Sequence, residues 1–233
     1  YTPVFVEGEE RIKEIYDLFV MVADDMFKDD PTVNLDEIKE KIVENLRLDA
    51  QDGVIQGATT LEAVLTDETA RKTVQGIILD PNKYDLSYAF TDTLNSRIDM
   101  ILNKYSDDCR AIFENIKTQA ATQGITQKEM QIMLEESLPT GRAETIARNE
   151  TGAAINGGRY DLDRWASDEF DMDCKLVWRT HPGCCDICAE LEGTTVELDK
   201  PFPDHIFVDG DEYSISSQWN NDGLLTQAHV NCR

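Results

Sequence analysis

The sequence predicts an α+β protein in which a mainly helical N-terminal part precedes a small mixed C-terminal module. Apolar residues recur at helical spacing over most of the first 157 positions, and shorter segments rich in aromatic residues follow. Five of the six cysteines fall after residue 170, so most candidate metal-binding or reactive residues lie in the C-terminal module. A chain of 233 residues with 41% hydrophobic content is long enough to bury a core.

The N-terminal stretch predicts two amphipathic helices. Between residues 9 and 27 the apolar side chains recur at i, i+3, i+4 and i+7, which places them on one helix face. Asn34 or Asp36 is expected to cap a second helix, because either side chain can accept hydrogen bonds from the first free amides. The apolar face of this second helix contains Leu35, Ile38, Ile42 and Leu46.

A less regular stretch follows. Gly53 and Gly57 lower its helical propensity. Thr66 is expected to cap a short helix that ends near Ile78. Asp80-Pro81-Asn82 is typical of a turn, so this helix is separated from the next.

The longest helical pattern runs from residue 88 to about 123 and ends at Gly124, a residue type common just past a helix C-terminus. Cys109 lies on its apolar stripe, so we interpret it as a small core residue. Thr126-Gln127-Lys128-Glu129 matches a capping box and predicts the start of a further helix. Pro139 and Thr140-Gly141 then separate that helix from the following one.

The composition of the sequence changes after Gly157-Gly158, and we expect the helical part to end at these glycines. Residues 175–180 and 194–198 predict short strands. We therefore divide the chain into a helical N-terminal region (1–124), a capped helix plus a packing helix (125–165) and a small cysteine/histidine module (166–233).

The charge is strongly acidic, with 22 Lys+Arg against 46 Asp+Glu and a formal net charge of −24. Such a chain repels phosphates over most of its surface, which disfavours broad DNA binding. Acidic faces exposed to solvent are sufficient to explain this charge. The more specific alternative is an acidic surface that binds a basic protein partner. No apolar run approaches the roughly 20 residues that a membrane span needs, and no signal peptide is evident. The chain begins at Tyr1 rather than at a methionine, which is compatible with a trimmed or partial product.

The stretch HPGCCDIC, residues 181–188, holds three cysteines and a histidine. Its Cys185-Asp186-Ile187-Cys188 part has the CxxC spacing with which two thiolates bind one ion from a tight turn. His229-Val230-Asn231-Cys232 supplies an imidazole and a third thiolate about forty residues later. The sequence therefore predicts a tetrahedral structural zinc site formed by Cys185, Cys188, His229 and Cys232.

Other chemistry is compatible with the same cysteines. A disulfide within the cluster or with Cys232, or plain buried thiols, is the simplest alternative. A redox CxxC should follow a strand and open a helix in a βαβ unit, and no such unit is evident. A catalytic thiol with a histidine as base also stays open. Cys184 is the ambiguous member, because adjacent cysteines rarely bind the same ion, and Cys174 is expected to face the core of its strand.

Residues 141–151 form a second patterned stretch. Its narrow apolar seam consists of Ala143, Ile146, Ala147 and Ala154. Glu144 and Arg148 form an i,i+4 pair in the favourable order, worth about 0.3–0.5 kcal/mol if exposed. A surface helix that packs through its seam explains this stretch, and Glu144 or Glu150 as a catalytic base is the alternative.

These stretches, in this order, resemble the phage head morphogenesis family, also called Mu F-like minor head proteins. The family helix is represented by Arg142, Glu144, Ile146, Ala147, Arg148 and Glu150, followed by Ala154, Asn156, Gly157 and Arg159. The later motifs are Lys175-x-x-Trp178-Arg179-Thr180, Cys185-x-x-Cys188-x-x-Leu191-x-Gly193-x-x-Val196-x-Leu198-Asp199-Lys200-Pro201-Phe202, and His229-Val230-Asn231-Cys232-Arg233. The resemblance covers roughly residues 125–233.

The resemblance implies a structural, non-enzymatic minor head protein of the virion that is present in the host cytoplasm during assembly. Its implied partner is the portal protein, with the major capsid or scaffolding protein as further candidates, and its implied role is to assist head assembly and genome packaging or delivery. Two other classes stay open. One is an enzyme that uses the cysteine cluster, such as a thiol or carboxylate hydrolase or a toxin-like transferase. The other is a zinc-binding adaptor unrelated to phage.

Overall fold

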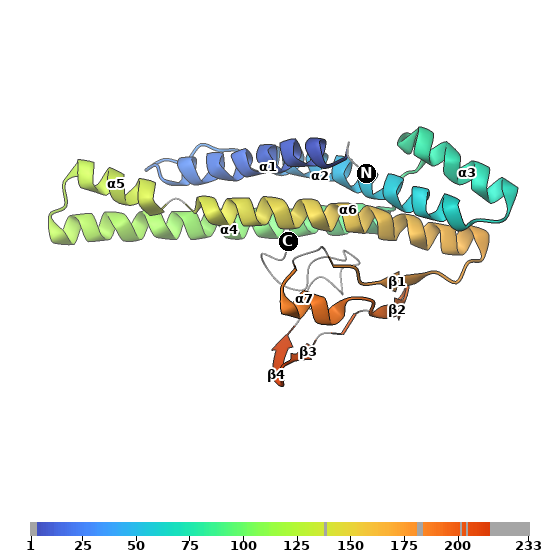
Figure 1. The fold of residues 1–233 in the computed structure, drawn as a ribbon. Coiled ribbons are helices and arrows are strands. Elements are labelled where there is room, and N and C mark those ends of the chain that lie inside the picture. The colour runs from blue at the N-terminus through green and yellow to red at the C-terminus, as the bar shows by residue number, and fades with distance from the viewer. Residues whose placement is uncertain (1–3, 138, 181–183, 201, 204, 215–233) are drawn as a thin grey trace. The chain divides into compact units, whose positions relative to one another are not determined.

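The computed structural model describes residues 4–214 except 138, 181–183, 201 and 204. This part of the chain is mostly helical, and a few short antiparallel strands with one short helix follow the six long α-helices (Figure 1). The predicted order, helices first and a small mixed module afterwards, is therefore confirmed. None of the helices in this part combines the length and the low charge that a membrane span requires.

The elements follow one another without large insertions. The helices are α1 (Val4–Met26), α2 (Leu35–Val64), α3 (Glu68–Leu79), the 3₁₀ turn η1 (Pro81–Lys83), α4 (Tyr88–Gln123), α5 (Gln127–Ser137), α6 (Thr140–Phe170) and α7 (Asp186–Leu191). The strands are β1 (Lys175–Val177), β2 (Thr195–Glu197), β3 (His205–Val208) and β4 (Asp211–Ser214). β1 pairs with β2 and β3 pairs with β4, both antiparallel.

Local capping signals were predicted well. The Asn34 side chain accepts from the amides of Asp36 and Glu37 at 3.2 and 3.4 Å, so Asn34 begins α2. In the capping box, the Thr126 amide donates to Glu129 at 2.8 Å and the Glu129 amide donates to the Thr126 hydroxyl at 3.3 Å. These reciprocal bonds satisfy amides that the first turn of a helix leaves without partners.

Of two further local predictions, the one for Gly124 is confirmed and the one for Thr66 is wrong. Gly124 follows α4 with φ +68°, the left-handed conformation expected of a glycine past a helix end. The cap of α3 is Asp67 rather than Thr66, because the Asp67 carboxylate accepts from the Ala70 amide at 2.8 Å. The predicted cap was therefore wrong by one residue.

The expectation that Gly157-Gly158 closes the helical part was wrong, because α6 continues to Phe170. The glycines serve close helix packing instead. A Cβ atom on Gly158 would lie 2.0 Å from the Ala50 carbonyl oxygen, and one on Gly53 would lie 1.8 Å from the Ile155 carbonyl oxygen. Helices α2 and α6 thus approach each other at a point where only glycine fits.

The chain forms two units that each combine segments distant in sequence. The first unit consists of Tyr1–Asn45 and Leu94–Arg148, and the second consists of Leu46–Thr93 and Asn149–Arg233. The borders fall inside α2, α4 and α6. The chain-order division into 1–124, 125–165 and 166–233 stays a prediction.

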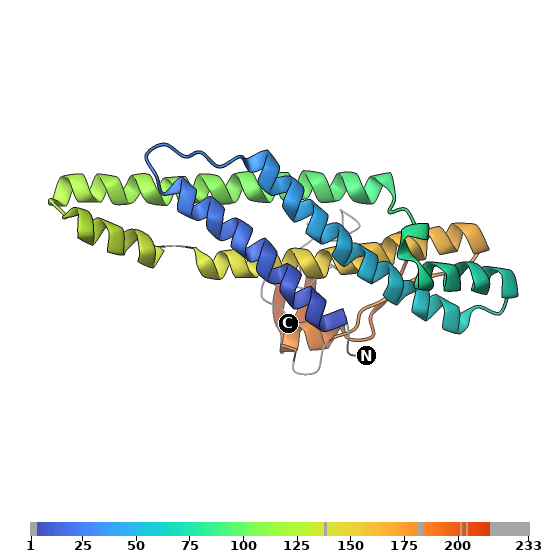
Figure 2. The same ribbon diagram turned by 90° about the horizontal axis from the view of Figure 1, so that it is seen from above.

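In the first unit, α1 packs against α4, and Figure 2 shows the two helices lying obliquely to one another. The ring of Phe19 meets the ring of Tyr105 edge to face at 5.0 Å, and both side chains are buried. Beyond the end of α1, the Arg110 guanidinium donates to the Lys28 carbonyl at 2.6 Å. The apolar stripe predicted for residues 9–27 therefore faces a core.

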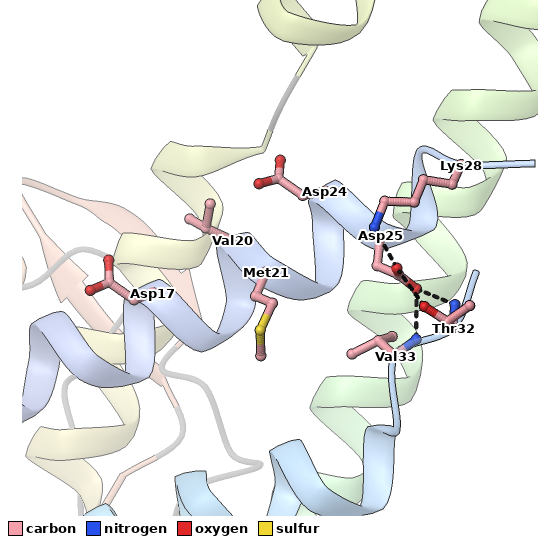
Figure 3. Close-up of a pocket in the computed structure, with 8 residues that line it drawn as sticks. All are labelled: Asp17, Val20, Met21, Asp24, Asp25, Lys28, Thr32 and Val33. Carbon is pink, nitrogen blue, oxygen red and sulfur yellow. Dashed lines mark hydrogen bonds and ion pairs between the residues drawn. The ribbon is translucent and has the colours of Figure 1, made fainter. Parts of the chain in front are cut away.

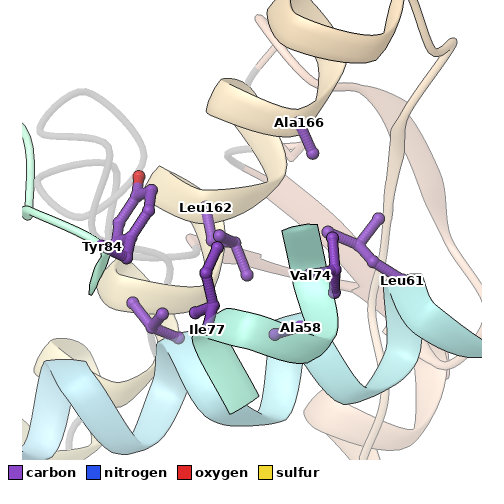
Figure 4. Close-up of a cluster of buried hydrophobic side chains, with 8 residues drawn as sticks. Ala58, Leu61, Val74, Ile77, Tyr84, Leu162 and Ala166 are labelled. Carbon is purple, nitrogen blue, oxygen red and sulfur yellow. The ribbon is translucent and has the colours of Figure 1, made fainter. Parts of the chain in front are cut away.

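In the second unit, α2, α3 and α6 bury one apolar cluster (Figure 4). Its buried members are Val54, Ala58, Leu61, Val74, Ile77, Tyr84, Leu162 and Ala166. The Asp161 carboxylate on α6 joins this cluster to the start of α4, because it accepts from the Tyr84 hydroxyl at 3.0 Å and from the Ser87 amide at 2.8 Å.

Candidate functional site

The C-terminal module builds a hairpin that closes around the cysteine-bearing segment. The Trp178 amide donates to the Thr194 carbonyl at 2.8 Å, and the Gly193 amide donates to the Trp178 carbonyl at 2.9 Å. Gly193 has φ +79°, a conformation that glycine adopts without strain. The β1–β2 pairing therefore extends to residue 178, and the ends of residues 179–192 are brought together.

Glu192 reinforces this closure. Its carboxylate accepts from the Thr180 amide at 2.5 Å, from the Thr180 hydroxyl at 2.8 Å and from the Arg179 guanidinium at 3.0 Å. The Thr180 bonds and then Arg179 hold the pKa of Glu192 below its usual range. The family-motif residues Arg179 and Thr180 thus hold one end of the cysteine segment to the other.

Cys185 and Cys188 lie at the start of α7. Cys185 is the N-cap residue and is exposed, whereas Cys188 lies inside the helix and is 2% exposed. Cys188 packs with Leu191 and Ile206, and Cys184 lies partly buried against the same cluster. One cysteine of the CxxC pair therefore lies at the surface of the module, and the other lies in its apolar core.

The other half of the predicted zinc site, His229 and Cys232, lies outside the described residues. Within them, no group of three or more histidine, cysteine or acidic side chains is placed to hold a metal ion, and no disulfide joins any two of the five cysteines. The assignment of Cys185, Cys188, His229 and Cys232 to zinc stays a prediction, as does a disulfide to Cys232. CxxC does open a helix, but both described strand pairs are antiparallel, unlike the βαβ context of a redox pair.

The other cysteines lie elsewhere. Cys109 is 1% exposed, and burial raises the pKa of its thiol to about 11, which confirms it as a core residue. Cys174 precedes β1 and is half-buried, and burial raises the pKa of its thiol. A thiol with a raised pKa is a poor nucleophile at neutral pH, so neither cysteine has the environment of a reactive thiol.

The family-motif helix is the N-terminal part of α6. Arg142 donates to the Asp108 carboxylate on α4 at 2.7 Å, and its guanidinium lies 5.7 Å from the centre of the Tyr105 ring. Arg142 holds the pKa of Asp108 below its usual range. Within the first unit, the motif arginine thus fastens α6 to α4.

The remaining motif residues divide between surface and interior. Glu144 and Arg148 form the expected i,i+4 ion pair at 3.0 Å, and both side chains are more than half exposed. Ala143 and Ala147 are fully buried, whereas Ile146 is half-buried, so the seam is confirmed mainly by its alanines. Glu150 is buried, in the second unit. No described contact gives Glu144 or Glu150 a catalytic role, and their assignment as site residues stays a prediction.

Sequence reasoning missed Asp25, a buried carboxylate in the last turn of α1. It accepts from the amides of Thr32 and Val33 at 2.6 and 2.7 Å and from the Lys28 ammonium at 2.7 Å (Figure 3). These bonds, led by that from Lys28, lower the pKa of Asp25 to about 2. The available signal was an acidic residue inside an apolar stripe, since Asp25 stands beside Met26.

The motif helix fastened to α4 and the closed cysteine hairpin both lie within one stretch of the chain that a protein-family model matches. A family model described as Phage Mu protein F like protein matches residues 111–233, which is more than half of the chain. The chain belongs to this Phage Mu F-like family of head morphogenesis proteins. The resemblance drawn from the motifs is therefore confirmed, and the match begins earlier than expected, inside α4. No curated protein and no solved structure matches the chain.

Proposed function

We propose that the chain is a structural, non-enzymatic minor head protein that associates with the portal at the inner face of the capsid. The family match over residues 111–233 is the observation that carries this proposal. In this proposal the protein works in the host cytoplasm during assembly and then stays in the virion. It assists genome packaging or delivery, and the major capsid or scaffolding protein is a further candidate partner.

Charge and family membership favour a role in protein binding over a role in DNA binding or in an unrelated pathway. The net charge of −24 disfavours a long DNA-binding track. Family membership favours this role over that of an adaptor unrelated to phage.

A binding experiment tests portal association. The chain is co-expressed with the portal protein encoded by the same phage, and the portal is purified through an affinity tag. We expect the chain to co-purify with the portal at a fixed ratio and to be absent when untagged portal is processed in the same way. Absence of the chain from purified portal would contradict the proposal.

The C-terminal module is proposed to be braced by one structural zinc ion. The donor chemistry supports this, since α7 presents two thiols one turn apart at its start and no disulfide joins them to one another. Cys185, Cys188, His229 and Cys232 would hold the ion. Zinc would supply no catalytic step here but would link the α7 hairpin to the C-terminal end of the chain.

Zinc content tests this brace directly. Purified chain should contain about one zinc ion per molecule by mass spectrometry of the metal. Cys188→Ser should reduce the zinc content at least tenfold, because a neutral hydroxyl is a poor zinc ligand. Cys109→Ser is the matched control, because Cys109 is also a buried cysteine but belongs to the first unit and is not among the proposed zinc ligands. Metal-free chain that remains fully folded, or equal zinc in both variants, would contradict the brace.

A further inference from the structure

Helix α1 carries an acidic face on the side opposite its buried residues. Glu10, Glu14, Asp17, Met21 and Asp24 follow one another at i, i+4, i+7, i+11 and i+14, which places them on one side of the helix. All five are exposed, and Met21 is 44% exposed. We call these five residues the α1 face. It lies entirely within the first unit.

A hollow of about 530 Å³ lies at the end of this face, where α1 meets the turn that leads to α2 (Figure 3). Its apolar lining consists of Val20, Met21 and Val33, and Figure 3 shows Met21 and Val33 on the same side of α1. Val20 and Val33 are only partly buried. The hollow can therefore receive an apolar side chain, and the flexible thioether of Met21 can adapt to its shape.

Hydrogen bonds within the chain hold the wall of this hollow in place. Asp25 lines the hollow, and its carboxylate accepts from the Thr32 and Val33 amides at 2.6 and 2.7 Å. Arg110 of α4 donates to the Lys28 carbonyl at 2.6 Å and so fastens the same turn. Binding to a surface that is already ordered costs less conformational entropy, so these contacts favour a docking role for the hollow.

The α1 face and the hollow are net negative even when every ion pair is counted. Together they hold five carboxylates, and among the described residues only Lys13 and Lys28 pair with them. Lys28 is held by the buried Asp25 at 2.7 Å, so that pair is neutral. Lys13 pairs with Asp17, but their side chains are 73% and 53% exposed, and such pairs contribute little. Asp24 forms no ion pair within the described part of the chain.

This charge, together with the apolar lining, favours a basic protein segment as the occupant. Residues 1–45, which carry the face, hold 13 acidic and five basic side chains. A metal ion does not fit, because no group of three or more histidine, cysteine or acidic side chains in the described residues is placed to hold one. The carboxylates repel the phosphates of nucleic acid. A segment with Lys or Arg beside an apolar residue matches both the charge and the hollow.

We propose that the α1 face and its hollow dock a basic segment of another head protein, one in which Lys or Arg flanks an apolar residue. The apolar residue enters the hollow beside Met21, and the basic side chains pair with Asp17 and Asp24. This inference rests on the proposed function, since the partner is taken from the assembled head.

The docking is tested in heads assembled by co-expressing the chain with the portal, capsid and scaffolding proteins of the same phage. The double variant Asp17→Lys/Asp24→Lys reverses the charge beside the hollow. It should lower the amount of chain per head by about tenfold or more in competition with the unchanged chain. Glu135→Lys/Glu136→Lys is the matched control, because it makes the same change of charge at two exposed positions of α5 in the same unit, and it should enter heads like the unchanged chain.

The melting temperature of the isolated chain separates lost docking from lost folding. Asp17→Lys/Asp24→Lys should leave it equal or higher, because lysine has a higher helix propensity than aspartate and is favoured in the last turn of a helix, where Asp24 lies. Met21→Gln keeps the length of an exposed side chain but removes its apolar contact. This variant should lower incorporation without changing the melting temperature.

A photo-crosslinking amino acid in place of Met21 identifies the occupant. The expected product links position 21 to a Lys- or Arg-bearing segment of another head protein. Crosslinks to a second copy of this chain alone, or incorporation of all variants at the level of the control, would overturn the docking proposal and leave the proposed function standing. If the unchanged chain does not enter heads, the proposed function fails and the docking proposal falls with it.

Discussion

The approach of α2 to α6 in the second unit gives the sharpest prediction on stability. Gly158→Ala adds one methyl group at a point where a Cβ would lie 2.0 Å from the Ala50 carbonyl oxygen and 2.8 Å from the Ala50 Cα. Ordinary contact needs at least 3.4 Å. These neighbours are helix backbone, which cannot rotate away, so the two helices must separate by more than about 1 Å.

The expected cost follows from two opposing effects. Overpacking of a well-packed contact costs about 1–3 kcal/mol, and separation also loosens Val54 and Leu162 in the adjoining apolar cluster. The gain in helix propensity from glycine to alanine returns about 0.5–1 kcal/mol. Taking the middle of both ranges, about 2 kcal/mol less about 0.75 kcal/mol, we expect Gly158→Ala to lower the free energy of unfolding by about 1 kcal/mol.

Urea unfolding followed by circular dichroism at 222 nm measures this effect, because the chain is mostly helical. Gly76→Ala is the matched control. It makes the same substitution in a helix interior, but no atom lies within 4 Å of the new methyl group. It should stabilise the chain by about 0.5–1 kcal/mol. The reasoning about the crossing is refuted if Gly158→Ala is as stable as the unchanged chain or shifts in the same direction as the control.

Two further predictions concern pH and two carboxylates with shifted pKa values, the buried Asp25 and the partly buried Asp163. The pKa of Asp25 is about 2 in the folded chain and about 3.9 in the unfolded chain, so ionised Asp25 stabilises the fold by about 2 kcal/mol above pH 4, and this stabilisation disappears as the pH falls toward 2. Asp25→Asn should lose this stabilisation at pH 7, as measured by urea unfolding. If the free energy of unfolding of the variant depends on pH between 2 and 5 as that of the unchanged chain does, this account of Asp25 is contradicted. Burial raises the pKa of Asp163 to about 6, so its ionisation disfavours folding progressively as the pH rises from 4 to 6. Asp163→Asn should therefore stabilise the chain at pH 7 by about 2 kcal/mol and have little effect at pH 4, and equal effects at both pH values would exclude this cause.

Helices and caps were predictable because their causes are local in sequence. A stripe of apolar residues repeats within each helix, and Thr126 and Glu129 meet because they lie one turn apart. The CxxC pair was placed at a turn for the same reason, and it does stand at the start of α7.

The missed features depend on partners far along the chain. Gly53 and Gly158 look like helix-breaking residues until α2 and α6 are brought together, more than 100 positions apart. Asp161 accepts from Ser87, 74 positions earlier. Single-sequence periodicity carries no information about such pairs, so the end of α6 was misplaced while its beginning was not.

The amount of this chain in heads assembled with and without the portal protein tests the central claim most directly. Purified heads from the two assemblies are compared by quantitative mass spectrometry, with the major capsid protein as the internal standard. Portal association predicts that the chain is present in portal-containing heads and falls at least tenfold when the portal is omitted. Equal amounts in both assemblies, or absence from both, would contradict it.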